Sequence, residues 1–251
     1  MATSGDTYSQ NAKFWIQIIR EKLDRYRTDL TDAVVLAALG DLEGKNILDG
    51  GCGEGYLSRE IHRRGATVTG LDVSASLIEA AISERDRLKL ARLTHYVAGL
   101  EAIPEDDATF DAVVCNHVMT DVEDAAEALK EISRVTKIGG KLVILMLHPC
   151  FYTAHAERNA SGSIPVDRYF NTRNISQNFK VAGVSSPDKV HMNFRPLEYH
   201  TTAILQSGYV IAQLSEPHPS PEQFQDAWWQ DNFVKPLFML IVAERVTRPV
   251  G

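Results

Sequence analysis

The chain has 251 residues, of which 44% are hydrophobic and 24% charged, so we expect a full hydrophobic core rather than disorder. This length fits one α/β domain with an elaboration, or at most two small domains. The formal net charge of −7 argues against a nucleic-acid-binding surface, which needs clustered Lys and Arg, but it leaves room for a local basic pocket.

The first forty residues carry helical patterns. Over residues 14–27, apolar side chains such as Phe14 and Ile18 recur on one face, which predicts an amphipathic helix. Residues 31–39 predict a second helix that ends at Gly40. We expect residues 1–40 to form an N-terminal helical cap and residues 41–251 to form the main domain.

From Lys45 onward, short apolar strands alternate with helices. Ser74 and Ser76 are candidate N-terminal caps for the second of these helices, and Gly65 closes the first. We expect strands over 46–49, 67–71, 94–98, 110–115 and 141–147, with helices over 56–64, 74–90 and 123–136. This alternation predicts βαβ units in a doubly wound parallel sheet, where ligands bind at the carboxyl ends of the strands.

The pattern breaks after Pro149. Residues 150–197 show no clear periodicity, and a long irregular insertion in a compact domain predicts a lid or an acceptor-binding segment. A helix over 198–206 and strands over 209–214 and 237–246 follow. The predicted fold is therefore α/β: a doubly wound, seven-stranded, mostly parallel sheet with an antiparallel edge strand, helices on both faces and a lid insertion after the fifth strand.

The most informative stretch is a glycine-rich loop after the first strand, Asp49-Gly50-Gly51-Cys52-Gly53-Glu54-Gly55. Glycines here let the backbone turn sharply and approach a ligand closely. The dinucleotide fingerprint fails because Tyr56 stands where its third glycine belongs, and the P-loop pattern fails because no Gly-Lys-Ser/Thr is present. Asp49 would oppose a pyrophosphate but favour a cation, which suits S-adenosylmethionine, a ligand with a sulfonium, an ammonium and no phosphate.

Asp72 ends the second strand, about 20 residues past the loop, the spacing of an acid that accepts both ribose hydroxyls. As an isolated residue, Asp72 would be explained by the favourable charge of an acid at a helix N-terminus. Together with the glycine loop, cofactor binding is the favoured interpretation.

These motifs resemble those of the class I S-adenosylmethionine-dependent methyltransferases. Asp49-x-Gly51-x-Gly53-x-Gly55 matches the first motif of that family. The loop with Ile103-Pro104, the strand from Phe110-Asp111 and the segment Val135-Thr-Lys-Ile-Gly-Gly-Lys-Leu-Val resemble its later motifs. The resemblance covers residues 45–147 and implies S-adenosylmethionine as cofactor and S-adenosylhomocysteine as product. It says almost nothing about the acceptor.

Carried over position by position, the resemblance implies that Asp49, Gly51 and Gly53 contact the methionyl part of the cofactor, with Gly50 in the same binding loop. Asp72 would hold the ribose.

The adenine side departs from the family pattern. Val73 would lie beside the adenine, but Leu100 replaces the acid that in many relatives accepts from the adenine amine. The adenine would then be bound by backbone groups of Leu100 and Glu101, or by the Glu101 side chain. Asn116, at the end of the fourth strand, completes the expected cofactor-binding set.

Candidate catalytic residues lie at the ends of the fourth and fifth strands. His148 is the preferred general base, since imidazole titrates near neutrality and the position should face the acceptor; a structural histidine bonded to a loop carbonyl is the alternative. His117 is a second, weaker candidate. For Asp121, capping of the helix that begins near Glu123 is the favoured interpretation.

The expected lid is rich in aromatic residues and histidines: Phe151, Tyr152, Tyr169, Phe170, Phe179, Phe194, His155 and His191. Its Lys and Arg outnumber its acids, opposite to the whole chain, which suggests an acidic acceptor; a solvated charged surface explains the excess equally well. By family analogy, Tyr8, Trp15 and Tyr26 are expected to cap the cofactor, although packing alone would explain Trp15.

The sequence also bears on several alternatives to methyl transfer to a small molecule. Asn116-His117-Val118-Met119 lacks the Asn/Asp-Pro-Pro-aromatic motif of N6-adenine methyltransferases, and no convincing acidic cluster supports metal-dependent catalysis. A non-catalytic S-adenosylmethionine-binding regulatory or assembly module and a nucleotide-dependent oxidoreductase remain as alternatives. We expect transfer to an O, N or C atom, and the elaborated lid suggests secondary metabolism.

Three cysteines, Cys52, Cys115 and Cys150, match neither a disulfide framework nor a zinc pattern. The N-terminus has no signal-peptide pattern, and the longest apolar run, residues 142–147, is too short to cross a bilayer. We therefore expect a soluble cytoplasmic protein with no metal, membrane or nucleic-acid partner.

Overall fold

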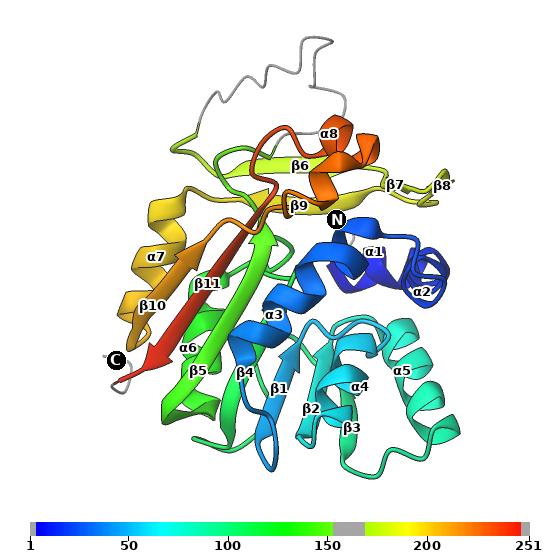
Figure 1. The fold of residues 1–251 in the computed structure, drawn as a ribbon. Helices are drawn as coiled ribbons and strands as arrows, with labels where there is room; N and C mark the ends of the chain where they lie inside the picture. The colour runs from blue at the N-terminus through cyan, green and yellow to red at the C-terminus, as the bar shows by residue number, and fades with distance from the viewer. Residues whose placement is uncertain (1–3, 153–168, 247–251) are drawn as a thin grey trace.

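A seven-stranded sheet forms the centre of the protein (Figure 1). The computed structural model describes residues 4–152 and 169–246. The strand order is β10-β11-β5-β4-β1-β2-β3. The strands are β1 (Asn46–Gly50), β2 (Thr67–Asp72), β3 (Leu93–Val97), β4 (Phe110–Asn116), β5 (Thr136–Leu147), β10 (Tyr209–Ser215) and β11 (Phe238–Arg245). β1 to β5 are parallel, and β11 runs antiparallel to both β5 and β10. The predicted doubly wound fold is confirmed.

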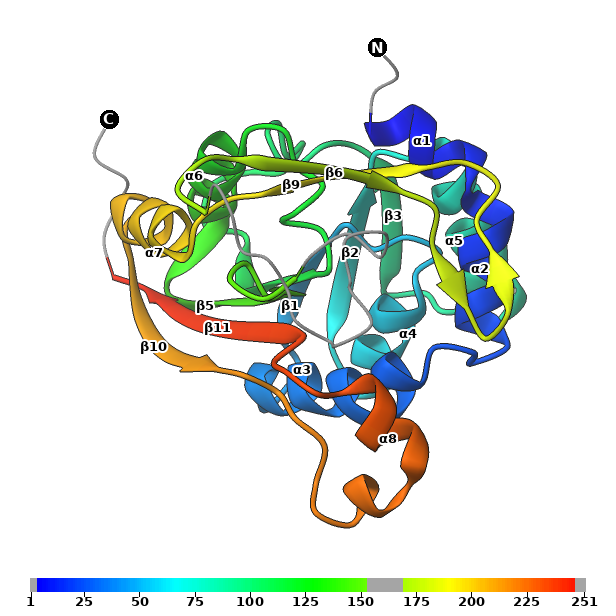
Figure 2. The same ribbon diagram turned by 90° about the horizontal axis from the view of Figure 1, so that it is seen from above.

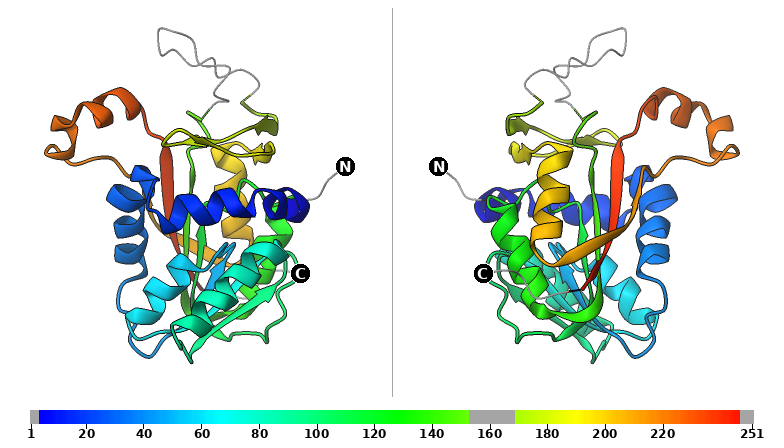
Figure 3. Two further views of the ribbon diagram at one scale, coloured as in Figure 1. Left: turned by 90° about the vertical axis from the view of Figure 1, so that its right-hand side faces the viewer. Right: turned by 90° about the vertical axis from the view of Figure 1, so that its left-hand side faces the viewer.

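Helices cover both faces of the sheet (Figure 3). They are α3 (Asp32–Leu39), α4 (Tyr56–Arg63), α5 (Ala75–Arg87), α6 (Ala125–Val135), α7 (Leu197–Gln206) and α8 (Ala227–Asn232). Side chains of β4 alternate between two cores: Val113 and Cys115 pack with α6 and α7, whereas Ala112 and Val114 pack with α3, α4 and α8. A parallel strand buried on both faces explains the continuous apolar run in the sequence.

The first helix ends earlier than the sequence predicts. The first amphipathic helix, α2 (Ala12–Arg20), stops early because Lys22 adopts φ +54° and the Leu23 amide donates to the Ile18 carbonyl at 2.9 Å. A π-helical segment, η1 (Arg27–Thr31), then leads into α3.

The N-terminal cap of α6 is Asp124, not Asp121. The Asp124 carboxylate accepts from the amides of Ala126 (3.1 Å) and Glu127 (3.0 Å), which satisfies two of the free donors of the first turn. The expectation that Asp121 caps this helix is therefore wrong. At α5, by contrast, the predicted cap Ser74 is confirmed, since its hydroxyl accepts from the Leu77 amide.

The described part of the predicted irregular insertion contains strands. β6 (Arg173–Gln177) pairs antiparallel with β9 (Val190–Phe194), and the short strands β7 (Lys180–Val181) and β8 (Val184–Ser185) form a hairpin between them. Residues 153–168, with His155, lie outside the described residues. Figures 1 and 2 show β6 and β9 running across the carboxyl ends of the parallel strands. This two-stranded ribbon therefore lies where ligands of such sheets bind.

The ribbon and the N-terminal helices enclose the same end of the sheet. α1 (Ser4–Gln10) packs against α5 and β9, and α2 packs against α5. α3, in contrast, packs on the sheet itself beside β4 and β5. Within the described ranges, no helix combines the length and apolarity needed to cross a bilayer.

Candidate active site

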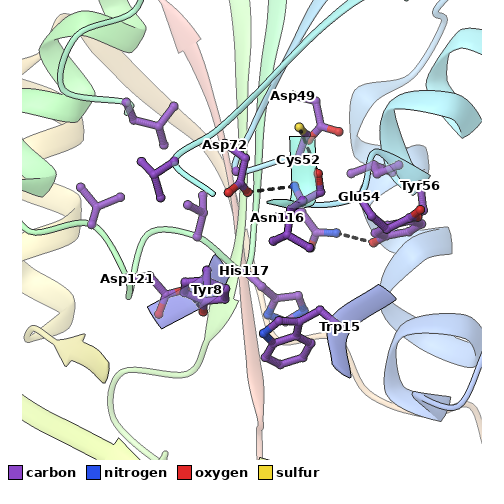
Figure 4. A pocket seen from close by; sticks show the side chains of 18 of the residues that line it. Tyr8, Trp15, Asp49, Cys52, Glu54, Tyr56, Asp72, Asn116, His117 and Asp121 are labelled. Atoms are coloured by element: carbon purple, nitrogen blue, oxygen red, sulfur yellow. Dashed lines mark hydrogen bonds between the residues drawn. The ribbon is translucent and has the colours of Figure 1, made fainter. Parts of the chain in front are cut away.

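A cavity of about 420 Å³ opens at the carboxyl ends of β1, β2 and β4 (Figure 4). Its volume suits a small organic ligand. The strand ends and following loops contribute one wall, and Tyr8 and Trp15 of the N-terminal helices contribute another. Segments distant in sequence therefore meet at this site.

The glycine loop after β1 forms the wall nearest the sheet. Gly51 and Gly53 both line the cavity in the left-handed region, at φ +73° and +56°. A Cβ on Gly51 would lie 2.5 Å from Val118 Cγ2, whereas a Cβ on Gly53 would meet nothing within 4 Å. Gly50 does not line the cavity, and its Cβ would lie 2.8 Å from Leu100 Cδ2, so packing explains this glycine.

Asp72 holds the loop and the next helix together. One carboxylate oxygen accepts from the Gly53 amide at 2.9 Å, and the other accepts from the Ser74 amide at 2.8 Å. Burial raises the pKa of Asp72, although these two hydrogen bonds oppose the shift. Each oxygen keeps a further lone pair for a ligand hydroxyl.

Asp49 lies deeper, with 1% of its surface exposed. The Ser58 hydroxyl donates to its carboxylate at 2.6 Å. Burial raises the pKa of Asp49 to about 6, and the nearby negative charge of Asp72 adds to the shift. A cationic ligand would lower the electrostatic cost of these two neighbouring acids.

Arg27 is a cavity residue that the sequence analysis missed. Its Nη1 donates to the Tyr56 hydroxyl at 2.6 Å, and that hydroxyl donates to Asp32 Oδ1 at 3.0 Å. Asn116 Nδ2 also donates to the Tyr56 hydroxyl, at 2.8 Å. No motif marks Arg27, because it reaches the site from η1, outside the strand-end pattern.

Comparisons with known proteins identify the family of this fold and loop. A family model described as a methyltransferase domain matches residues 48–144. A solved S-adenosylmethionine-dependent methyltransferase from Mesorhizobium loti has a TM-score of 0.70 at 26% identity, covering 85% of this chain and 96% of its own. A Listeria monocytogenes structure with a TM-score of 0.71 at 23% identity, covering 86% and 96%, shows the fold alone.

Residues 48–144 thus form a methyltransferase domain, and the whole fold is similar to that of solved S-adenosylmethionine-dependent methyltransferases.

The names of two curated relatives indicate different methyl acceptors. A ubiquinone biosynthesis O-methyltransferase of Alkalilimnicola ehrlichii is 35% identical over 114 residues, which cover 45% of this chain and 46% of that protein. A malonyl-[acyl-carrier protein] O-methyltransferase of Pseudescherichia vulneris is 35% identical over 145 residues, covering 57% and 49%. The chain thus spans about half the length of these relatives.

The polar groups of the cavity fit the cofactor of these methyltransferases. S-adenosylmethionine carries a sulfonium, an ammonium, a carboxylate and a ribose, and the wall offers carboxylates for the cations and Arg27 for the anion. Within the described part of the chain, Asn116 Oδ1 and Trp15 Nε1 are among the buried atoms of cavity residues that lack a hydrogen-bond partner. Unpartnered buried polar atoms are costly, so their presence here points to a bound ligand.

The adenine side of the methyltransferase site contains Val73, Ala98, Leu100 and Glu101. Val73 is 41% exposed, and Leu100 packs its side chain into the core while it still borders the cavity. A Cβ on Gly99 would lie 3.0 Å from Glu101 Oε2, so this carboxylate folds back over the backbone of the loop. Glu101 is thus an acid of the same loop that borders the cavity directly after the apolar Leu100.

The two candidate histidines occupy different environments. His117 lines the cavity at φ +61°, and burial, with the charge of Arg27, lowers its pKa to about 3. His148 is not among the cavity residues: its Nδ1 accepts from the Cys150 amide at 3.2 Å, so its Nε2 donates to Glu216 Oε1 at 2.9 Å. Both ring nitrogens are thus bonded to groups outside the cavity, so this arrangement does not support His148 as the base.

One further expectation, for Tyr26, is corrected. Tyr26 does not reach the cavity; its ring packs against Trp228 and Phe238, and its hydroxyl donates to the Asn232 carbonyl at 3.0 Å. Tyr8 and Trp15 do line the cavity.

Two of the basic residues of the insertion donate hydrogen bonds to backbone carbonyls. Arg173 donates to the carbonyls of Pro149 (2.7 Å) and Tyr152 (3.1 Å), and Arg195 donates to those of Val122 (3.0 Å) and Glu123 (2.6 Å). These contacts explain part of the local basic excess without an acidic acceptor.

Proposed function

We propose that this protein transfers the methyl group of S-adenosylmethionine to an O, N or C atom of a small molecule. The main observation in its support is that the glycine loop, the buried acids Asp49 and Asp72 and the cation Arg27 line one cavity. This set of charges is complementary to a ligand that joins a sulfonium, an ammonium and a carboxylate.

Each part of the cofactor has a partner in this proposal. Asp72 accepts from the ribose hydroxyls, Arg27 binds the carboxylate, and Asp49 with the loop backbone at Gly51 and Gly53 binds the methionyl ammonium. On the adenine side, Val73 and Leu100 provide apolar contact, Glu101 provides polar contact, and Asn116 offers its unpartnered oxygen.

The bound cofactor supplies an electrophilic methyl group on a good leaving group. The chain's contribution is therefore mainly to position the acceptor in line and to exclude water. Tyr8 and Trp15 on the N-terminal helices, with the β6–β9 ribbon across the sheet end, are proposed to cover the site. We propose residues 1–40 as the cap, although α3 within them packs on the sheet, and residues 150–197 as the lid, within a cytoplasmic protein.

A cofactor-binding experiment tests the site. Asp72→Ala should weaken S-adenosylmethionine affinity about 30-fold or more, because a charge-assisted hydrogen bond is worth about 2 kcal/mol. Asp106→Ala, an exposed acid outside the cavity, is the matched control and should leave the affinity unchanged. Calorimetric titration of both variants measures this, and equal affinities would remove Asp72 from the site.

The main alternative is a binding module that holds the cofactor without turnover. Formation of S-adenosylhomocysteine separates the two functions, because only the methyltransferase consumes its cofactor in an acceptor-dependent way. Binding of NADH in place of S-adenosylmethionine would instead favour the oxidoreductase alternative.

A further inference from the structure

We propose that Asp121 is the general base that removes a proton from a neutral acceptor O–H or N–H group, and that Tyr8 positions it. This inference rests on the proposed methyl transfer and adds to it the class of acceptor and the residue that receives the proton.

The placement of Asp121 leaves it available for this role. It lies in the loop after β4 and lines the cavity with its neighbours Val122 and Glu123. The helix that follows takes its cap from Asp124 instead, so capping does not account for Asp121. The Tyr8 hydroxyl, 113 residues away in sequence, donates to Asp121 Oδ2 at 2.8 Å. In Figure 4 the two side chains lie together at the cavity.

The loop that carries Asp121 is held from the insertion side. Arg195 donates to the carbonyls of Val122 and Glu123, and the Asn193 amide donates to the Thr120 carbonyl at 2.6 Å. The residues directly before and after Asp121 are thus fixed by β9 and the segment after it. A catalytic group needs this kind of support to hold its geometry within a few tenths of an ångström.

The titration of Asp121 also suits a base. Burial raises its pKa to about 7, the charge of Asp72 adds to the shift, and the Tyr8 hydrogen bond opposes it. The cavity's other titratable or charged residues are Arg27, Asp49, Cys52, Glu54, Tyr56, Glu101, His117 and Glu123. A base is most effective when its pKa lies near the working pH, which favours Asp121 over His117, whose pKa is lowered to about 3.

Proton transfer and methyl transfer are coupled in the proposed step. The Asp121 carboxylate accepts the proton of the acceptor X–H, and the freed electron pair of X forms the bond to the methyl carbon. The electrons of the broken carbon–sulfur bond remain on sulfur, which leaves a neutral thioether, a methylated acceptor and a protonated Asp121 that later releases its proton to solvent.

The charge of the cavity favours a neutral acceptor over a carboxylate. A carboxylate acceptor has already lost its proton and needs no base, and it would meet the negative charges of Asp49, Asp72 and Asp121. A neutral hydroxyl, by contrast, both needs a base and avoids this repulsion. An acceptor of the hydroxyl kind therefore fits this site better than an acyl carboxylate.

The test compares Asp121→Asn with Asp106→Asn, an exposed control that loses the same charge. Methyl-labelled S-adenosylmethionine and a small-molecule extract are the probes for transfer, and S-adenosylhomocysteine is the probe for binding. We expect Asp121→Asn to reduce the transfer rate about 100-fold or more while S-adenosylhomocysteine still binds within about threefold of the wild type. Asp106→Asn should match the wild type.

Tyr8→Phe provides the readout for positioning. Loss of its hydrogen bond should raise the pKa of Asp121, so the acid limb of the pH–rate profile should move to higher pH. Carbon-13 NMR of the Asp121 carboxyl in cofactor-free protein should show a near-neutral midpoint that also rises in Tyr8→Phe.

The outcomes separate this inference from the proposed function. Equal transfer by wild type and Asp121→Asn, or an NMR midpoint near 4, would overturn the assignment of Asp121 and leave the methyltransferase intact. Absence of transfer by the wild type would overturn the proposed function and this inference together.

Discussion

Acidic side chains dominate the chemistry of the cavity. Burial raises the pKa of Asp49, Asp72 and Asp121, because each carboxylate loses hydration at the site, and the charge of Asp72 adds to the shifts of Asp49 and Asp121. Such a cluster is unfavourable for the empty protein and favourable for a bound cation. The electrostatics of the site thus agree with a sulfonium ligand.

Arg27 is the counterpart of these acids, and its proposed partner can be tested directly. Arg27→Gln should weaken S-adenosylhomocysteine binding about 30-fold, because the proposed charge-assisted contact to the carboxylate is lost. Methylthioadenosine, which lacks the amino acid part, should bind Arg27→Gln and wild type equally. Arg25→Gln is the matched control, since Arg25 pairs with Asp29 and Asp226 outside the cavity. Equal weakening for both ligands would contradict the assignment.

At the scale of elements, the N-terminal helices connect the cofactor side to the acceptor side. Arg20 of α2 pairs with Glu54 of the glycine loop at 2.9 Å, and Tyr8 of α1 reaches the loop after β4. α1 and α2 are short, and isolated helices of this length are unstable in water. Their order therefore depends on these tertiary contacts.

Hydrogen exchange should report this dependence. We expect amide exchange over residues 4–20 to slow when S-adenosylhomocysteine binds, because Tyr8 and Trp15 line the cavity that the ligand fills. Exchange over α7, which packs against α6 and β10, is the internal control. Unchanged exchange over residues 4–20 in the bound protein would show that these helices do not cover the ligand.

The elements differ in how well sequence could predict them. The βαβ core follows from alternation of apolar runs with capped helices, so its strands were placed within one or two residues, apart from the earlier start of β5. The ribbon was missed although Val190, Met192 and Phe194 alternate inward, because β6 and β9 are short and separated by a hairpin. Only part of the site could be predicted from the sequence. Asp49 and Asp72 belong to a recognisable motif, while Arg27 and Asp121 reach the cavity through tertiary placement alone.

At the scale of the whole molecule, the buried acid Asp49 should lower the free energy of unfolding of the cofactor-free protein. Burial raises the pKa of Asp49 to about 6, so its ionised form destabilises the folded state above that pH. This cost disappears as pH falls through 6 toward about 4, the ordinary range of an unfolded aspartate.

Asp49→Asn should therefore stabilise the cofactor-free protein at pH 7.5, by about 2 kcal/mol or roughly 5 °C in Tm, and the gain should vanish near pH 4.5. Asp111→Asn is the control and should instead destabilise the protein at pH 7.5. Burial opposes the ionised form of Asp111, but the hydrogen bond from the Asn46 amide and the Lys137 ammonium outweigh it and lower the pKa. Thermal unfolding at several pH values measures both. A destabilised Asp49→Asn at pH 7.5 would contradict this account.

The most direct test of the methyltransferase assignment is transfer of label from methyl-labelled S-adenosylmethionine in a native cell extract, followed by fractionation. We predict that label enters the small-molecule fraction with wild-type protein and is lost with Asp72→Ala. Label in protein or RNA would contradict the small-molecule acceptor, and no label in any fraction, with the cofactor bound, would contradict methyl transfer itself.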